Sequence, residues 1–579
     1  MDLPARRQLC RELSRGEAAN LESERRERLR RSLADSLKAL KEDDRDPIGY
    51  CRAARCHEAL GQHEDAIAAL EKGLKCCMPS PRLYREFIWF AEKSNRTEAA
   101  IEAAQQAQSL FPEDFLMKLK AALILPRLYD TPEDVEYYRR RFAGGLLKLS
   151  EELLLDTPDA KRRALGGIAK HVNFFLAYQG RNDRELQEQY GKLVSRIMAA
   201  NYPQWTEPLP MPPVAPGGKI RIGYITPFFW NHTVTTLFLG WIQEQSRSSF
   251  DVYAYHVGDK TDSVTEEVQR AATEFCHFPG DLDGVCNRVR SDNLHVAVFL
   301  DVGMNPIMAQ IASLRLAPIQ CVAWGHPVTS GLPNADYFIS SALMEPVEAQ
   351  DHYSERLVCL PGIGISYPKP VIPQALLGRN REEFGIRADA IVYLSSQSTF
   401  KYRPEHDDVF AHIARRVPAA HFVFLERNKI VRSDFRKRLG GAFATLGLEA
   451  SEYCTILPQQ SHFDYWNLSL VSDVFLDSLE WSGGRSTMEA VACGLPVVTM
   501  PGRFMRGRHS YAILTQVGAA DTIAHDKSAF IDIAARLGVD HQWRHAVVHR
   551  MEAGYPSLYS DTRCVRELEE FFRHVADKK

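Results

Sequence analysis

A proline-rich break constrains the fold of this chain more than any other feature, because it separates two stretches of different residue pattern. Five prolines lie between Pro208 and Pro216, and two glycines follow them. Proline fixes φ and lacks a backbone N–H donor, so this segment can be neither a helix nor a central strand. We therefore predict a domain boundary, with one domain over residues 1–201 and a linker over residues 202–218.

A 34-residue repeat precedes the break. Similar segments begin at Pro47 and at Pro81, and Ala66 of the first aligns with Ala100 of the second. This period resembles that of the tetratricopeptide repeat, a helix–turn–helix unit whose stacked copies form a concave face for an extended peptide. Two units are fewer than a stable stack needs, so helices over residues 115–200 are expected to complete the domain. A plain helical bundle that only packs against the next domain is the alternative.

Short runs of β-branched and aromatic residues alternate with helix-length polar segments after the linker, which is typical of doubly wound parallel sheets. The first series of runs covers 220–226, 251–257, 295–301 and 319–324, and the second covers 390–396, 421–426, 454–457, 473–478 and 496–500. A Pro- and Gly-containing stretch at 367–378 separates the two series. We predict an α/β protein with Rossmann-like lobes over 219–378 and 379–579, the second ending in a C-terminal helix. A ligand is expected in the cleft at the carboxyl ends of the strands.

The composition excludes several classes of partner. Hydrophobic residues make up 45% of the chain and charged residues 25%, and the net charge is −3, so we expect no nucleic acid and no anionic membrane. No apolar run reaches the ~18 residues of a membrane span, and the N-terminus has no apolar signal region.

The twelve cysteines lack metal-ligand spacing, and we interpret the acidic pair Asp281 and Asp283 as a surface turn. The expectation is a cytoplasmic protein with no metal and no resident cofactor.

A glycine-rich turn followed by a helix is the first candidate for chemistry. The residues GGRST at 483–487 follow a predicted strand, and Glu489 lies one turn into the helix. A helix N-terminus after such a turn presents unpaired N–H groups and the positive end of the helix dipole, which together bind phosphate. Glu489 could accept hydrogen bonds from a ribose. An ordinary glycine turn and capped helix is the alternative for this segment alone.

A lysine and a histidine follow strands in the two predicted lobes. Lys401 comes after the run 390–396, where it could neutralise a diphosphate leaving group together with the helix N-terminus and without a metal. His232 comes after the run 220–226 and could take a proton from an acceptor hydroxyl or bind the sugar. The alternative for His232 is a helix-capping residue.

An ordered set of motifs in the first lobe resembles glycosyltransferase family 41. The motifs are LAPIQ, Gly325-His326-Pro327, Thr329-Ser330-Gly331, Asp336-Tyr337 and Tyr353-Ser354-Glu355. That family contains the protein O-GlcNAc transferases, the SPINDLY proteins and the bacterial N-glucosyltransferases, and the resemblance extends from about residue 219 to beyond residue 502. It implies an inverting, metal-independent enzyme of the two-lobed GT-B type, which transfers a sugar from a UDP-sugar to a protein held by the helical repeats.

The resemblance also implies roles for individual residues. Lys401 matches the lysine that contacts the UDP phosphates, Tyr465 the position that stacks on uracil and Glu489 the acidic residue that holds the ribose. His232 matches a proposed general base. We predict His232 and Lys401 as catalytic residues and a donor site of Lys401, Gln397, Ser398, Tyr465, His462, Gly484, Arg485, Ser486, Thr487, Glu489 and Arg508. Contacts to sugar or acceptor are predicted at His326, Thr329, Trp481, Asp292 and His295.

The chain also departs from the family pattern. The histidine and a threonine of the family's NGHTT motif are replaced by Gly484 and Arg485. Trp481 stands where the animal enzymes have a small cysteine, so its ring could fill the space for an N-acetyl group, and this favours UDP-glucose over UDP-GlcNAc. Two other functions stay open: a non-enzymatic scaffold with degenerate transferase lobes, which the altered turn would explain, and a UDP-sugar epimerase, which shares the two-lobed fold.

Overall fold

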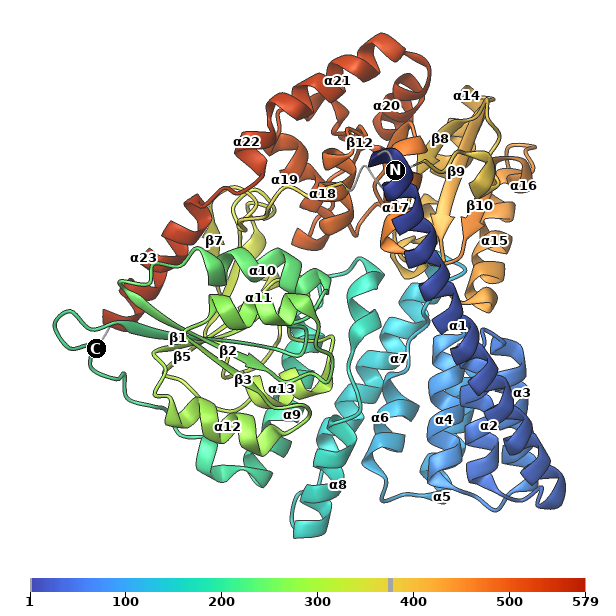
Figure 1. The fold of residues 1–579 in the computed structure, drawn as a ribbon. Coiled ribbons are helices and arrows are strands. Elements are labelled where there is room, and N and C mark those ends of the chain that lie inside the picture. The colour runs from blue at the N-terminus through green and yellow to red at the C-terminus, as the bar shows by residue number, and fades with distance from the viewer. Residues whose placement is uncertain (1–2, 373–377, 578–579) are drawn as a thin grey trace.

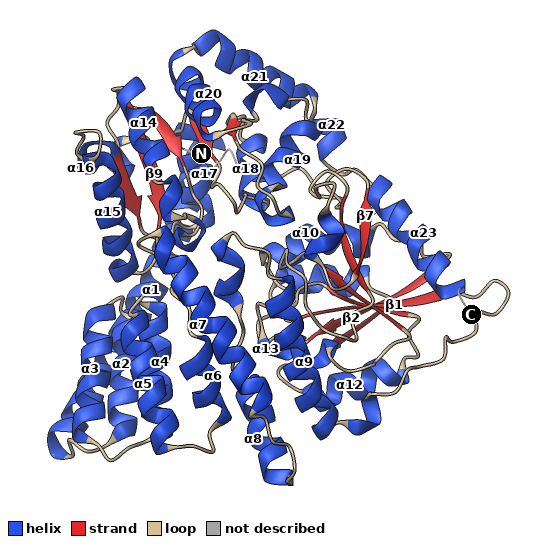
Figure 2. Ribbon diagram, turned by 180° about the vertical axis from the view of Figure 1, so that it is seen from behind, coloured by secondary structure: helices blue, strands red, loops and turns tan. Residues whose placement is uncertain are grey.

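A helical N-terminal part lies against two α/β lobes (Figure 1). The computed structural model describes the backbone of residues 3–372 and 378–577, and the side chains from residue 23 onward. Residues 373–377, within the stretch expected to separate the two lobes, lie outside this description. Both sheets are enclosed by helices on their faces (Figure 2). The predicted α/β class, with two Rossmann-like lobes behind a helical-repeat region, is confirmed.

The helical part contains the predicted repeat. Helices α2 (Pro47–Ala59) and α4 (Pro81–Lys93) begin 34 residues apart, and so do α3 (His63–Cys76) and α5 (Thr97–Leu110). The aligned Ala66 and Ala100 are completely buried, because the paired helices approach closely there. The remaining helices of this part are α1 (Leu3–Glu42), α6 (Phe115–Leu123), α7 (Pro132–Glu151), α8 (Pro158–Ile168), the 3₁₀ helix η1 (Phe174–Gln179) and α9 (Arg184–Asn201).

The helical part contacts both lobes. Helix α9 packs against α13 (Pro306–Ala312) of the first lobe, and η1 packs against the 3₁₀ turn Thr399–Lys401 of the second. The predicted linker also folds onto the first lobe, since Trp205 is buried and its carbonyl accepts the N–H of Arg315 at 2.8 Å. The repeats therefore do not form a separate arm.

The first lobe is built on a seven-stranded parallel sheet with strand order β3-β2-β1-β4-β5-β6-β7. Its strands are β1 (Ile220–Thr226), β2 (Phe250–His256), β3 (Glu274–His277), β4 (Val296–Phe299), β5 (Ile319–Ala323), β6 (Tyr337–Ser341) and β7 (Arg356–Leu360). Helices α10 (Thr233–Gln243), α11 (Ser263–Ala271), α12 (Leu282–Ser291) and α13 (Pro306–Ala312) connect them. All four strands predicted for this lobe form, and β3, β6 and β7 are additional.

The second lobe is built on a five-stranded parallel sheet with strand order β10-β9-β8-β11-β12. Its strands, all predicted, are β8 (Ile391–Leu394), β9 (Ala420–Leu425), β10 (Cys454–Leu457), β11 (Val474–Leu476) and β12 (Val497–Val498). Its helices are α14 (Asp408–Arg416), α15 (Lys429–Ala444), α16 (Ala450–Tyr453), α17 (His462–Val471), α18 (Arg485–Ala492), α19 (His509–Gln516), α20 (Lys527–Val539), α21 (His541–Ala553) and α22 (Tyr555–Leu558).

The C-terminal helix α23 (Arg563–Asp577) packs on the first lobe, not on the second as its place in the sequence predicts (Figure 1). Phe572 and Phe571 contact Phe250 and Tyr337 of the first lobe. The carboxylate of Glu569 accepts the backbone N–H of Ser246 at 2.7 Å. The apolar face of α23 is therefore buried by the first lobe, and the expected boundary at residue 379 does not separate all of the structure.

The strand order of the two sheets indicates where a ligand site lies. In each sheet the order reverses beside the first strand of the lobe, between β1 and β4 and between β8 and β11. In open α/β sheets ligands bind at such switch points, outside the carboxyl ends of the strands. His232 follows β1, Lys401 follows β8 and the glycine-rich turn follows β11, so the predicted chemistry comes from the switch points of both sheets.

Candidate functional site

A cavity of about 640 Å³ lies between the two lobes, and η1 of the helical part borders it. Most of the predicted site residues line it together. They are His232, His326, Gln397, Ser398, Lys401, His462, Tyr465, Trp481, Gly484, Arg485, Ser486 and Glu489.

A buried carboxylate shapes the turn that opens α18. Asp477, at the end of β11, accepts the N–H of Gly483 at 2.8 Å and the hydroxyl of Ser482 at 2.6 Å. A Cβ at Gly483 would lie 2.6 Å from the side chains of Gln397 and Ser486, so a larger residue would displace both of them. No described side chain caps the N-terminus of α18. The first N–H groups of this helix are therefore available to an anion in the cavity.

Lys401 is joined to that helix end by a short chain of hydrogen bonds. Its Nζ donates to Oε1 of Gln397 at 2.7 Å, and Nε2 of Gln397 donates to Oγ of Ser486 at 2.5 Å. Burial lowers the pKa of Lys401 to about 8, against a smaller opposing effect of Asp477. A buried ammonium beside an uncapped helix N-terminus is an arrangement that favours a bound polyanion such as a diphosphate.

Tyr465 and Glu489 lie on the neighbouring wall. The hydroxyl of Tyr465 is 3.0 Å from Oγ of Ser396. Glu489 accepts a hydrogen bond from Nε of Arg485 at 2.8 Å. Nη1 of Arg485 also lies 3.5 Å from the hydroxyl of Thr236 in α10, so this arginine spans the cleft from one lobe to the other.

His232 is the N-cap residue of α10, as its alternative interpretation predicts. Its Nδ1 accepts the N–H of Val234 at 3.3 Å, and its ring stacks on Phe228 with centroids 4.1 Å apart. Burial, with the charges of Arg485 and Lys260, lowers the pKa of His232 to about 4. A neutral imidazole whose Nδ1 accepts a hydrogen bond carries its proton on Nε2. In this arrangement His232 can donate a hydrogen bond at Nε2 but has no free lone pair there to accept a proton.

Two aromatic residues of the helical part complete the cavity. Tyr178 stacks on Trp481 with centroids 3.9 Å apart, and Phe174 stacks on His326 at 5.6 Å. Burial, with the charge of Arg506, lowers the pKa of His326 to about 3, so this imidazole is neutral. The site prediction did not include Phe174 and Tyr178, because both belong to a segment assigned to the repeats. Their only signal in the sequence is the aromatic run FFLAY at residues 174–178, between α8 and α9.

His509 also lines the cavity and is absent from the prediction. A Cβ at Gly484 would lie 3.7 Å from its Nδ1, which has no hydrogen-bond partner in the described part of the chain. Burial and the charge of Lys401 lower the pKa of His509 to about 3. Its position next to the predicted Arg508 is the sequence signal that could have identified it.

Asp292 and His295 are not brought to the cavity. Both precede β4 and therefore lie at the amino edge of the sheet, opposite to the cleft. Asp292 accepts hydrogen bonds from Tyr255 at 2.6 Å and Arg288 at 2.7 Å, and Nδ1 of the buried His295 accepts the N–H of Arg221 at 3.0 Å. The prediction of a sugar or acceptor contact at these two positions is therefore wrong, because their polar groups hold the first lobe together.

Three further predicted residues lie beside the cavity without lining it. Oγ1 of Thr329 donates to Glu355 at 2.5 Å, and Oγ1 of Thr487 is 2.7 Å from Oγ of Ser510. Arg508 donates to the carbonyl of Gly502 at 3.3 Å, and its guanidinium lies over the ring of Tyr511. In this structure their side chains support the loops around the site.

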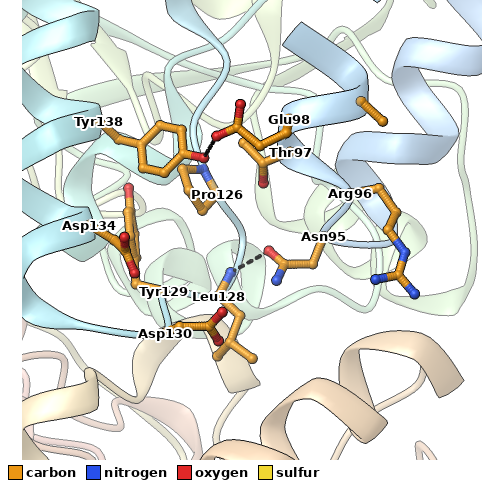
Figure 3. Close-up of a pocket in the computed structure, with 11 residues that line it drawn as sticks. Asn95, Arg96, Thr97, Glu98, Pro126, Leu128, Tyr129, Asp130, Asp134 and Tyr138 are labelled. Carbon is orange, nitrogen blue, oxygen red and sulfur yellow. Dashed lines mark hydrogen bonds between the residues drawn. The ribbon is translucent and has the colours of Figure 1, made fainter. Parts of the chain in front are cut away.

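A separate cavity of about 420 Å³ lies in the helical part, between the α4–α5 turn and α7 (Figure 3). Asn95 accepts the N–H of Leu128 at 2.9 Å, and Tyr138 donates to Glu98. These bonds close the repeat against α7, and none of the predicted site residues lies here. No group of three or more potential metal ligands occurs among the side chains of residues 23–372 and 378–577. No helix in the same ranges is long and apolar enough to cross a membrane.

Two parallel-sheet lobes that face each other across a ligand cleft define the class of this protein, the GT-B fold. The O-GlcNAc transferase of Thermobaculum terrenum, as a lysine-to-methionine mutant, has a similar fold with a TM-score of 0.65. The comparison covers 94% of this chain and 98% of that one, at 21% identity. The likeness therefore extends over the helical part as well as the lobes.

The sequence matches the model of glycosyl transferase family 41 over residues 165–364 and 369–558, and the chain belongs to that family. The match begins within α8, so the family module includes η1 and its residues Phe174 and Tyr178, which line the cavity.

Two curated relatives come from Arabidopsis thaliana. One is the probable UDP-N-acetylglucosamine–peptide N-acetylglucosaminyltransferase SPINDLY, 25% identical over 56% of this chain and 36% of its own length. The other, SEC, carries the same description and is 23% identical over 67% of this chain and 40% of its own length. The matched region thus spans well under half of the curated relatives.

Proposed function

We propose that this protein is an inverting glycosyltransferase that transfers a hexose from a UDP-sugar to a protein side chain without a metal ion. The observation that carries the proposal is the connection of Lys401, through Gln397 and Ser486, to the uncapped N-terminus of α18 inside the cleft. This is a site for a diphosphate. Family membership and the relatives' descriptions as UDP-GlcNAc–peptide transferases support a UDP-sugar donor and a polypeptide acceptor.

The reaction is a single displacement at the anomeric carbon. The acceptor oxygen or nitrogen forms a bond to this carbon while the bond to the β-phosphate oxygen breaks, the configuration inverts and UDP leaves with the electron pair. Lys401 and the N–H groups of α18 stabilise the charge that develops on UDP, and no metal is needed for that task. In the proposed complex Tyr465 stacks on the base and Glu489 holds the ribose, the roles that the family resemblance implies for them. The proton that the acceptor loses in this step passes to water or to an oxygen of the departing UDP phosphate.

His232 is assigned to positioning in this scheme. Because Nδ1 accepts the N–H of Val234, Nε2 carries a proton and can donate it to an oxygen of the sugar or the acceptor. The lowered pKa of about 4 also makes the free imidazole a poor proton acceptor near neutral pH. In the proposed reaction His232 is therefore not the general base that the family resemblance implies.

The sugar end of the cavity favours UDP-glucose, with UDP-GlcNAc the next choice. Trp481 is only 7% exposed and is stacked against Tyr178. In this proposal the two rings fill the space that an N-acetyl group would need. The relatives' names argue for UDP-GlcNAc, and the two donors are distinguished by experiment. The cytoplasm is the proposed location, because the described cysteines are free thiols, the form that a reducing compartment maintains.

Calorimetric titration tests the proposal. UDP, UDP-glucose and UDP-GlcNAc are titrated in a chelator into the wild type and into Lys401→Ala. We expect a Kd for UDP of about micromolar in the wild type, a large loss in the variant, and a fall in transfer rate of about 10²–10³-fold. If UDP fails to bind the wild type, the scaffold is the better description. Epimerised sugar without labelled protein would indicate a UDP-sugar epimerase.

A further inference from the structure

A second cavity lies behind the wall that carries His232. It measures about 460 Å³, within the ~300–1,000 Å³ typical of ligand pockets. Its lining includes Phe228, Trp230, Lys260, Asn305 and Gln310. These residues come mainly from the loops after β1, β2 and β4, so the cavity opens at the carboxyl edge of the first sheet, where ligands of such sheets bind.

Two thin walls separate this cavity from the donor cleft. In the loop after β1, Phe228 and Trp230 face the second cavity while His232 lines the donor cleft. After β4, Met304 lines the donor cleft and Asn305 lines the second cavity. The rings of Phe228 and His232 are stacked, so a molecule in the second cavity lies one ring away from the proposed positioning residue.

One side-chain amide faces the cavity and makes no hydrogen bond within the described part of the chain. It belongs to Gln310 on α13, a residue that is only 5% exposed and lines the cavity. Gln320 of the same lobe is the contrast, because its amide donates to the carbonyls of Leu314 and Asn334 and accepts the N–H of Leu316. Since the amide of Gln310 faces the cavity, it is available to pair with a bound ligand.

The remaining lining indicates which ligand fits. Asn305 uses its Oδ1 to accept the N–H of Ile307, which leaves its Nδ2 as a donor. Side-chain amides such as Asn305 and Gln310 match the C=O and N–H groups of a peptide main chain. Phe228 and Trp230 offer ring surface for an apolar side chain, and Lys260 lies over the Trp230 ring at 4.4 Å.

We propose that this cavity is an acceptor subsite, which binds an extended polypeptide segment next to the residue that receives the sugar. Asn305 and Gln310 hold the main chain, and Phe228 and Trp230 contact an apolar side chain. The acceptor side chain then passes the His232 wall into the donor cleft. This inference rests on the proposed function, since it names where the acceptor of that reaction binds.

The test uses the full-length protein and an array of decapeptides with Ser, Thr or Asn at the centre. Transfer of labelled sugar from UDP-glucose and from UDP-GlcNAc is measured for the wild type, Gln310→Leu and Trp230→Ala. Trp543→Ala is the matched control, because Trp543 is also a partly exposed indole under a cation, Arg536, but lies on α21. We expect both cavity variants to raise the KM for peptide about tenfold, as expected for a lost hydrogen bond or ring contact. Their affinity for UDP stays within about twofold of wild type.

The outcomes separate the two proposals. Peptide KM values equal to those of the wild type and Trp543→Ala, in both cavity variants, would overturn the acceptor subsite and leave the transferase intact. Loss of UDP affinity in Gln310→Leu would also overturn it, because the residue would then act on the donor side. Absence of UDP binding in the wild type itself rejects the transferase, and this inference with it.

Discussion

The affinity for a UDP-sugar is expected to fall about tenfold between pH 7 and pH 9, because Lys401 loses its proton in the free protein over that interval. Burial lowers the pKa of this lysine to about 8. The bound diphosphate stabilises the ammonium form, so binding above pH 8 requires the uptake of a proton. Affinity therefore decreases as the pH rises, and the decrease is the linkage between protonation and binding.

The magnitude follows from the protonated fraction of Lys401. With a pKa of about 8, roughly nine-tenths of the lysine is charged at pH 7 and one-tenth at pH 9. If the pKa in the complex lies above this range, the apparent Kd rises about tenfold, or about 1.4 kcal/mol. UDP-glucose is the suitable probe, since its diphosphate is a diester with no titration in this interval.

Calorimetry at pH 7, 8 and 9 measures this slope, in buffers of different ionisation enthalpy so that proton uptake is counted directly. Lys401→Met should bind weakly at every pH without the slope. Lys401→Arg should keep a charge at every pH and lose the slope while retaining more affinity, because a guanidinium does not titrate here. A Kd for the wild type that changes less than about threefold, or a slope that persists in Lys401→Met, would refute the assignment of Lys401 to the diphosphate.

Three other perturbations test the surroundings of the site. Tyr178→Ala removes the ring stacked on Trp481, so the ratio of UDP-GlcNAc to UDP-glucose affinity should rise at least about tenfold in competition titrations. An unchanged ratio would show that the two rings do not determine which donor binds. Asp183→Ala leaves the buried Arg506 and the partly buried Arg139 without their shared carboxylate, which should cost about 3–5 kcal/mol in chemical denaturation. Burial raises the pKa of Asp301 to about 7, above its ordinary value, so stability contributed by its protonated form is lost as the pH rises through that value. Asp301→Asn should therefore lose less melting temperature between pH 5 and pH 8 than the wild type does, and equal losses would contradict that pKa.

The sequence pattern predicted the central strands because parallel strands buried on both faces are continuous apolar runs. Strand β1 is such a run, and it lies in the middle of its sheet. Strand β3 was missed because it is a four-residue edge strand whose Glu274 and His277 are exposed, so it has little apolar pattern. The position of α23 could not be predicted either, because an amphipathic helix does not specify which lobe buries its apolar face.

Site residues were predicted correctly where they directly follow a strand, because the end of a strand fixes the edge of the sheet at which the next residues lie. His232, Lys401 and Gly484 follow strands at the two switch points, and the carboxyl ends of parallel strands meet at one edge. The same rule explains the error at His295, which directly precedes β4 and must therefore lie at the opposite edge. Tyr178 could not be predicted in this way, because its place depends on how the helical part packs against both lobes.

One short segment of the helical part touches both cavities. Ala169, just after α8, lines the proposed acceptor subsite, and Phe174 and Tyr178 line the donor cleft. The segment is held from the second lobe by Arg506, which donates to the carbonyl of Arg181 at 2.6 Å and lies 3.1 Å from Asp183. A polypeptide bound to the first lobe and a sugar bound to the second would therefore meet the same few residues. Since this segment contacts both lobes, the two lobes without the helical part would lack a wall at each of the two cavities.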